Sequence, residues 1–379
     1  MNQNNLKQIF QQYIDNFETL NTKYEEYYKW AVCRDFPVLM KKTLESDKDA
    51  FWRNLYEAKK ATYNIIDSYT QPFMGLVEFA KEDPEAVRKL LIGLYAPDGG
   101  DLKVQMEKIA DFFKRSEELL EKYYPGRYLY KQNSHSVSAL LFLNDPDHHY
   151  MYKATQSRAF ADCAEFYDDW GTGDNIKLDV YYRMCDELVA RIKECKELLD
   201  VDDSRYDKEL NAKSRDIFAD TERHLLAFDI IYCSTTHDLY SGVTYTKRDV
   251  KAKKAFIENK VKAEGLKKSF DKAKADMDAL QEVKDYLVKM IAVGDKIEHK
   301  AYGTGVVKAF DGDKMMLSFE EKEGQYSFMT LVANGIISVD KPGFKEKIEE
   351  YKDIIKKHDL IPRVLDYAAK ALEPYEELL

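Results

Sequence analysis

The residues of this sequence whose types and spacing best suit chemistry lie between positions 135 and 149. Asp145, Asp147, His148 and His149 are close neighbours, and His135 lies ten residues before Asp145. Imidazoles and carboxylates ligate zinc and manganese, so His135, Asp145 and His149 could form the centre of a metal-dependent nuclease. Adjacent histidines on an extended segment point to opposite faces, which weakens a shared metal site. A solvated turn is therefore the favoured interpretation, and the nuclease remains an alternative.

Cys233 lies near His224 and His237 in the sequence, so a Cys-His dyad can be drawn. A nucleophile also needs a positioned base and an oxyanion site. The apolar residues before Cys233 favour a packed helix in which this thiol is a small buried hydrophobe. We therefore predict no catalytic residue, no metal and no cofactor.

The strongly basic part of the chain lies between residues 251 and 274. The lysines that could contact nucleic-acid phosphates there are Lys251, Lys253, Lys254, Lys260, Lys267 and Lys268. Acidic residues such as Glu258 and Asp271 alternate with them, so a solvated helix face with i,i+4 ion pairs is the simpler interpretation. A phosphate-contacting arm is the alternative, and its binding would weaken steeply as salt rises.

The hydrophobic period changes from 3.6 to 2 near Val293, which indicates a change from helices to strands. Strands are predicted at 296–300, 305–310, 314–319 and 325–330, with a hairpin turn at Asp311-Gly312. This pattern predicts a small five-stranded SH3/Tudor-like barrel over 292–341. Gly303 and Gly305 are assigned to a tight turn, because such turns favour residues without a Cβ.

Aromatic side chains of this barrel divide between its interior and an exposed face, because alternate strand residues point to opposite sides. The residues that we assign to a protein-binding patch are His299, Tyr302, Phe310 and Tyr326. Such a patch would suit a peptide or an extended protein segment.

The rest of the chain has the apolar spacing of helices. Helices are predicted from Leu6, after a break at Phe36-Pro37, at 49–68, after an N-cap at Asp83, and at 102–123, 156–170, 178–199, 224–232, 248–291, 344–358 and 362–379. The segment 138–143 is a short strand or helix, 200–207 is an acidic loop, and Gly265 interrupts a helical hairpin or long arm. The predicted parts are a helical domain at 1–123, a mainly helical recognition-like domain at 124–246, a lysine-rich arm at 247–291, the barrel at 292–341 and helices at 342–379.

The composition is that of a globular protein with more than one core. The chain has 379 residues, of which 45% are hydrophobic and 33% charged, and a net charge of −10, which argues against a surface that follows a phosphate backbone along its whole length. Five scattered cysteines fit neither a disulfide framework nor a zinc ribbon. There is no signal-peptide pattern and no apolar run of membrane-spanning length. We expect a cytoplasmic protein without a membrane partner.

A pattern of the form G-D-x-I-x-H-x-x-Y/F-G-x-G-x-V opens the predicted barrel. Its residues are Gly294, Asp295, Ile297, His299, Tyr302, Gly303, Gly305 and Val307. This stretch resembles the Tudor-like or SH3-like barrel at the C-terminus of UvrD/PcrA-type helicases. The resemblance implies docking on a protein, notably RNA polymerase, which suits an acidic module better than DNA does.

A second resemblance covers about residues 120 to 245. It is carried by the segments 135–138, 141–153, 181–187 and 223–232. They resemble the region ahead of the motor in restriction proteins of the McrB type, which implies target recognition. The sequence contains no G-x-x-x-x-G-K-[ST] loop to hold phosphates, so nucleotide hydrolysis is not implied.

The sequence therefore predicts a mainly α protein with a multi-helix body and a small SH3/Tudor-like barrel near the C-terminus. The leading hypothesis is a non-catalytic recognition or adaptor protein of a bacterial phage-defence system. It would bind protein through the barrel, with RNA polymerase or a defence-complex subunit as the implied partner, and protein or nucleic acid through the helical body. The alternatives are the nuclease described above and a structural subunit of a larger complex.

Overall fold

The computed structural model describes residues 1–173, 175–207, 217–357 and 361–379, and the chain divides into two compact units, Met1–Asp249 and Val250–Leu379. The predicted fold class is confirmed, because the chain is mainly helical with a five-stranded antiparallel sheet between residues 296 and 338. The first two predicted parts lie in the first unit. The arm, the sheet and the C-terminal helices lie in the second, apart from the first residues of the arm.

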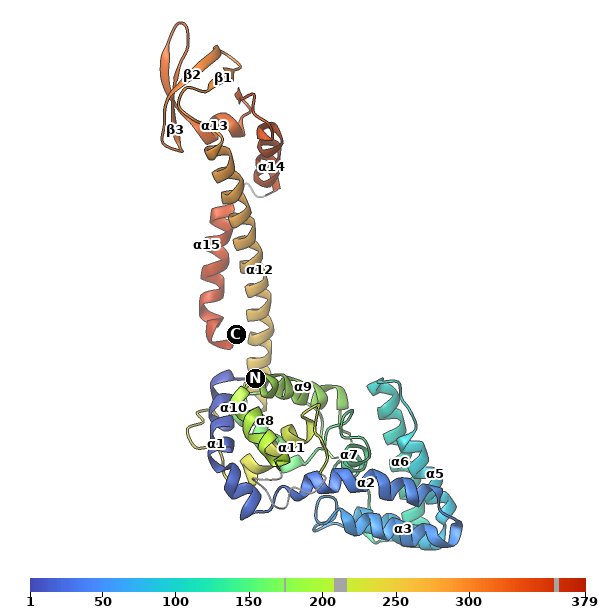
Figure 1. Ribbon diagram of the computed structural model, residues 1–379. Coiled ribbons are helices and arrows are strands. Elements are labelled where there is room, and N and C mark those ends of the chain that lie inside the picture. The colour runs from blue at the N-terminus through green and yellow to red at the C-terminus, as the bar shows by residue number, and fades with distance from the viewer. Residues whose placement is uncertain (174, 208–216, 358–360) are drawn as a thin grey trace. The chain divides into compact units, whose positions relative to one another are not determined.

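The first unit is built of helices (Figure 1). Short polar side chains cap the starts of several of them. Its helices are α1 (Gln3–Thr22), α2 (Tyr28–Glu45), α3 (Lys48–Ala61), α4 (Pro72–Glu82), α5 (Pro84–Tyr95), α6 (Leu102–Tyr123), η1 (Tyr128–Tyr130), α7 (Ser134–Asn144), α8 (Ala154–Cys163), α9 (Leu178–Glu194), α10 (Lys196–Asp203), η2 (Ser204–Tyr206) and α11 (His224–Thr236). Asp47, Asp83 and Asp101 each precede a helix, and their carboxylates accept a backbone N–H of its first turn. The predicted N-cap at Asp83 is confirmed.

One apolar core runs through the first unit. Helix α2 packs along α3 and against α7, while α1 packs against α10 and α11. Side chains such as Tyr13, Phe36, Phe142 and Tyr181 are fully buried in this core. Residues on both sides of position 123 therefore share one core.

The second unit combines a helical hairpin with a curled sheet. Its elements are α12 (Val250–Lys289), β1 (Lys296–His299), β2 (Gly303–Phe310), β3 (Lys314–Ser318), β4 (Glu323–Ser327), α13 (Phe328–Ala333), β5 (Ile337–Ser338), α14 (Phe344–Lys357), α15 (Ile361–Leu372) and η3 (Glu373–Leu378). Figure 1 shows α15 running beside α12 in the opposite direction. The sheet has the order β4-β3-β2-β1-β5 and forms a half-barrel. Val283 and Leu287 of α12 belong to the same core as Ile297 and Val307 of the sheet.

Several predictions for the first unit were wrong. The helices predicted at 49–68 and 156–170 end early, because α3 stops at Ala61 and α8 at Cys163. Pro37 lies inside α2 and does not separate two helices. A proline in a helix interior removes one hydrogen bond, but the burial of Phe36 and Met40 on the same helix holds the chain in place. The acidic stretch 200–207 is not a loop, because α10 continues to Asp203 and a 3-10 turn follows it.

The second unit required two corrections as well. Gly265 does not interrupt α12, which is one continuous helix, and the second helix of the hairpin is α15. Residues 328–330 are the start of α13 and not the end of a strand. The buried side chains of Phe328, Met329 and Val332 follow the spacing of a short helix, so burial on one helical face replaces the expected alternation. The hairpin turn at Asp311-Gly312 is confirmed by the pairing of β2 with β3.

No helix in the described part of the chain combines the length and the apolar composition that a membrane span requires.

Candidate functional site

Four ring side chains come together at one end of the half-barrel, and we call them the aromatic cluster: His299, Tyr302, Phe319 and Tyr326. The imidazole of His299 stacks on the ring of Tyr302, with 4.7 Å between centroids. Phe319 lies 5.4 Å from Tyr302 and 6.3 Å from Tyr326 by the same measure. Tyr302 is 46% exposed, whereas Phe319 and His299 are buried. The cluster thus has a buried floor and an open tyrosine wall.

The strands and turns of the sheet bring these rings together. His299 ends β1, Tyr302 lies in the turn to β2, Phe319 follows β3, and Tyr326 lies in β4. Because β1, β2, β3 and β4 are adjacent in the sheet, residues at these positions reach the same end of it. The backbone N–H of Ala301 donates to Nδ1 of His299 at 3.1 Å, so this imidazole is neutral with its proton on Nε2.

Lys322 places its ammonium against the cluster. Its Nζ lies 3.5 Å from the ring centroid of Tyr302. The backbone N–H of Phe319 donates to the carbonyl of Lys322 at 2.8 Å, which closes the turn between β3 and β4 and holds the lysine on this side. A hydrogen bond with Tyr302 raises the pKa of Lys322. Burial and the nearby Lys322 charge lower the pKa of His299, so the imidazole adds no positive charge at neutral pH.

Gly305 is required for close approach of a ring. A Cβ at this position would lie 2.5 Å from one ring carbon of Phe319 and 2.8 Å from another. Gly303 has a φ of +69° and serves the predicted turn, whereas Gly305 has a different purpose from the one predicted. It leaves the space that Phe319 fills.

We expect a Gly305→Ala substitution to lower the stability of the half-barrel by about 1–3 kcal/mol, because overpacking forces the ring of Phe319 or strand β2 to move. Amide hydrogen exchange of β2 and β3 measures this effect. Gly265→Ala is the matched control, since nothing lies within 4 Å of its Cβ position on α12. That control should stabilise the helix by roughly 0.5–1 kcal/mol. Equal exchange rates for wild type and Gly305→Ala would contradict the packing argument.

The sequence prediction of the barrel patch identified three of the four cluster residues. His299, Tyr302 and Tyr326 are together, while Phe310 packs against Phe328 with 5.1 Å between centroids. Phe319 and Lys322 were missed as site residues. Phe319 ends the strand predicted at 314–319, but only the structure shows that its ring fills the space beside Gly305.

The predicted lysine arm is the long helix α12. Lys251, Lys254, Lys267 and Lys268 are exposed, and Lys253 and Lys260 are half-buried. Lys267 forms an i,i+4 ion pair with Asp271, which is the pairing that the simpler interpretation expected.

The three histidines between positions 135 and 149 have different hydrogen-bond partners. Nδ1 of His135 lies 2.8 Å from the carbonyl oxygen of Tyr152, and its Nε2 lies 2.7 Å from that of Ile65. Burial lowers the pKa of His135 to about 4. His148 is paired with Asp145 at 2.9 Å, and His149 with the hydroxyl of Tyr182 at 3.1 Å. His135 therefore joins two backbone segments and is not positioned as a ligand beside His149.

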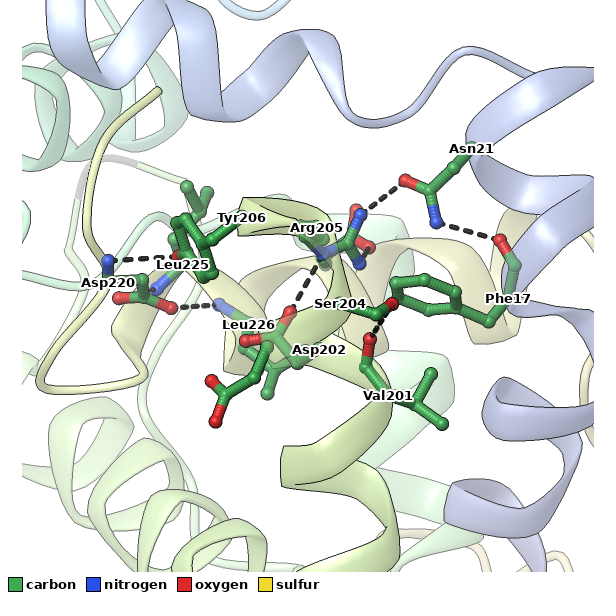
Figure 2. A network of polar contacts seen from close by, with 12 residues as sticks. Phe17, Asn21, Val201, Asp202, Ser204, Arg205, Tyr206, Asp220, Leu225 and Leu226 are labelled. Carbon is green, nitrogen blue, oxygen red and sulfur yellow. Dashed lines mark hydrogen bonds and ion pairs between the residues drawn. The ribbon is translucent and has the colours of Figure 1, made fainter. Parts of the chain in front are cut away.

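A buried ionic network lies in the core of the first unit, and Figure 2 shows part of it. We use this name for Tyr13, Lys29, Asp202, Arg205, Arg223 and Asp229. Asp202 receives bonds from Arg205 at 2.7 Å and Arg223 at 2.6 Å. Asp229 accepts bonds from Lys29 and Tyr13.

Three cationic groups of this network, Lys29, Arg205 and Arg223, face the carboxylates of Asp202 and Asp229. The neighbouring carboxylate of Glu26 lies 2.9 Å from Nζ of Lys29 and adds a third negative charge. Burial alone would raise the pKa of Asp229, but Lys29 and Arg205 more than offset this, so its pKa lies below the usual range. Arg205 also stacks on Trp30, with 3.8 Å from Cζ to the ring centroid. No local pattern indicates this network, because its members come from α1, α2, α10, η2 and α11 and from Arg223 directly before α11.

One group in the described residues has the composition of a metal site. Glu26, Cys233 and His237 each have a potential ligand atom within 4.8 Å of the others. However, Nζ of Lys29 lies 2.9 Å from Glu26 and 3.9 Å from Sγ of Cys233. Burial and the charge of Asp229 raise the pKa of Cys233 well above its usual value. A protonated thiol and a resident ammonium make this group an extension of the ionic network.

Comparisons with protein-family models, curated proteins and solved structures found no match for this chain. The site must therefore be interpreted from its own geometry.

Proposed function

We propose that this protein is a non-catalytic recognition or adaptor protein that binds a protein partner through the aromatic cluster. The observation that carries this proposal is the position of Lys322, whose ammonium lies 3.5 Å from the ring centroid of Tyr302. A lysine or arginine side chain of a partner would take the same place. Such a contact contributes about 0.5–1 kcal/mol when exposed and about 2 kcal/mol when water is excluded.

The surroundings of the cluster favour a basic partner. Glu298, Glu320, Glu321 and Glu323 are exposed on the strands and the turn that carry the cluster residues. The net charge of the whole chain is −10. Acidic groups around a cation-accepting cluster attract basic segments and repel nucleic acid.

The edge of the sheet supplies a second element of recognition. β4 stands at the end of the strand order and carries Tyr326. An extended partner segment can pair with such an edge through main-chain hydrogen bonds, while alternate side chains enter neighbouring pockets. A segment on β4 would therefore bring its side chains close to the cluster.

The two sequence resemblances support a wider form of the same proposal. The barrel pattern of UvrD/PcrA-type helicases implies a protein partner such as RNA polymerase. The McrB-like region implies a phage-defence setting, in which another chain would supply the motor that this sequence lacks. In this proposal the first unit recognises a second target, either protein or nucleic acid.

We expect a partner captured by tagged full-length protein at high salt to bind Tyr302→Ala about tenfold to thirtyfold more weakly than wild type, which corresponds to the loss of a desolvated cation–π contact. Tyr302→Phe keeps the ring and should retain most of the affinity. Lys322→Ala should bind more tightly, because the internal ammonium no longer competes. Affinities measured by calorimetry with the purified partner decide these outcomes.

Tyr367→Ala is the matched control, because Tyr367 is a 77% exposed tyrosine on α15 and lies outside the cluster. Equal loss of affinity in Tyr302→Ala and Tyr367→Ala would reject the cluster as the binding site. Nucleic acid that is retained at low salt and lost as salt rises would instead favour the lysines of α12.

A further inference from the structure

Lys153 places a second amino group beside the buried ionic network of the first unit. Its Nζ lies 4.8 Å from the ring centroid of Tyr232, and Nζ of Lys29 lies 4.1 Å from the same centroid. Lys29 is held in place by ion pairs with Asp229 and Glu26. Like charges at a partly buried site repel each other, so the fixed ammonium of Lys29 disfavours a charge on Lys153.

Lys153 has no counter-ion of its own in the part of the chain that the structure describes. Glu26 is the acidic group whose charge acts on it there. However, this carboxylate already pairs with Lys29 at 2.9 Å and with Nε2 of His237 at 2.7 Å. The nearby Tyr232 and His135 are neutral at pH 7, because burial raises the pKa of the tyrosine and lowers that of the histidine. The neighbours of Lys153 therefore leave its charge poorly compensated.

These surroundings favour the neutral amine of Lys153. Burial and the charge of Lys29 lower its pKa to about 8, although Glu26 opposes the shift. At pH 7.5 roughly a quarter of such amines are free, compared with about 0.1% of lysines with an ordinary pKa. A lysine is a nucleophile in its neutral form, and a second cationic group beside it is a recognised means of activation.

The amine of Lys153 also remains within reach of solvent. Its side chain is half-buried. Its nitrogen is not among the unpaired side-chain nitrogen and oxygen atoms of the described residues that are sealed from solvent. A small reagent can therefore approach it, in contrast to the ammonium of Lys29, whose side chain is 2% exposed.

We propose that Lys153 is an acylation site, at which the amine reacts with an acyl thioester and keeps the acyl group as an amide. Nζ forms a bond to the carbonyl carbon, the carbon–sulfur bond breaks, and the leaving thiolate takes up the proton that the nitrogen loses. The product is neutral, so acylation removes the repulsion with Lys29, and the acyl group can lie against the ring of Tyr232. This inference is independent of the aromatic cluster, which belongs to the other unit.

The test treats the full-length protein with S-acetyl-N-acetylcysteamine, a small uncharged acetyl thioester, and measures initial acetylation rates by peptide mass spectrometry. Lys114 is the internal reference, because it is an exposed lysine of α6 in the same unit. We expect Lys153 to react at least about tenfold faster than Lys114 at pH 7.5, since its larger fraction of free amine outweighs its partial burial. An equal or lower rate at Lys153 would overturn the proposal.

The dependence of these rates on pH separates activation of the amine from simple accessibility. The rate at Lys153 should level off above about pH 8, where its amine is free, while the rate at Lys114 continues to rise to pH 9.5. Parallel profiles for the two lysines would reject the activation. Lys153→Arg should lose the fast acetylation and leave the rate at Lys114 unchanged, whereas fast acetylation that persists in this variant would place the site elsewhere.

A measurement of stability tests the electrostatic cause separately. Lys153→Met keeps the length of the side chain without its charge and should melt about 2–4 °C above wild type at pH 7. Because the folded state binds the proton of Lys153 more weakly than the unfolded state, wild type should gain stability as pH rises above 8, and the difference should shrink by pH 9.5. Lys114→Met is the matched control and should show no such pH-dependent difference. A lower melting temperature for Lys153→Met at both pH values would show that the ammonium is well accommodated and would contradict the proposal.

Discussion

Replacement of Asp229 by alanine is expected to lower the free energy of unfolding of the first unit by about 3–5 kcal/mol, the usual cost of removing one partner from a buried ion pair. Asp229 is fully buried and forms ion pairs with Lys29 and, at 3.6 Å, with Arg205. Without this carboxylate, the ammonium of Lys29 keeps Glu26, at 2.9 Å, as its ion-pair partner among the described residues. A buried cation that loses its main counter-charge is strongly unfavourable.

Urea denaturation with hydrogen exchange of α1 and α11 as a local reporter measures this change. Asp200→Ala is the matched control, because Asp200 forms an i,i+4 ion pair with Lys196 on the surface of α10 and its side chain is 60% exposed. Surface pairs of this kind contribute about 0–1 kcal/mol. Similar losses in Asp229→Ala and Asp200→Ala would show that the network contributes no more than a surface pair.

The second large effect is a dependence of stability on pH that originates at Asp220. Burial raises the pKa of this carboxyl to about 7, although the backbone N–H groups of Leu226 and Leu225 oppose the shift. Its two oxygens accept these N–H groups at 2.8 and 3.1 Å, as Figure 2 shows. The folded state therefore holds a proton that the unfolded state has already released between pH 3.8 and about 7.

A proton bound more tightly in the folded state makes stability fall as pH rises. We expect the contribution of Asp220 to decline by up to about 4 kcal/mol from pH 4 to pH 7, at 1.36 kcal/mol for each unit of pKa difference. Asp220→Asn cannot titrate and should lose this part of the pH profile. Urea denaturation of both proteins across this range measures the difference, and Asp200→Asn should follow the wild-type profile. Parallel profiles for wild type and Asp220→Asn would contradict the assignment.

Local sequence patterns predicted the elements whose residues interact with near neighbours. The stripe of apolar residues in α1, the bounds 102–123 of α6 and the N-cap at Asp83 all depend on residues within a few positions of one another. The change from period 3.6 to period 2 predicted the sheet for the same reason. The turn at Asp311-Gly312 also follows from a short connection, between β2 and β3, whereas the pairing of β5 with β1 joins residues far apart in the sequence.

Patterns that depend on distant residues were misinterpreted. The acidic residues at 200–207 are typical of a solvated loop when only their neighbours are considered. Asp202 and Arg205 are buried because Asp229, Arg223 and Tyr13 meet them in the folded chain. Charged residues can be buried in a core when they are paired with opposite charges and hydrogen-bonded there. Local periodicity in the sequence does not encode such long-range pairing.

The same distinction between short-range and long-range interactions applies to the candidate sites. The sequence by itself determined the helical body, the strand segments and the aromatic residues of the barrel, because periodicity and turn residues act over short distances. Tertiary structure alone decided that Phe319 and Lys322 join His299, Tyr302 and Tyr326, and that Phe310 packs with Phe328. These outcomes depend on which strands and helices become neighbours, and that is set by the packing of the whole unit.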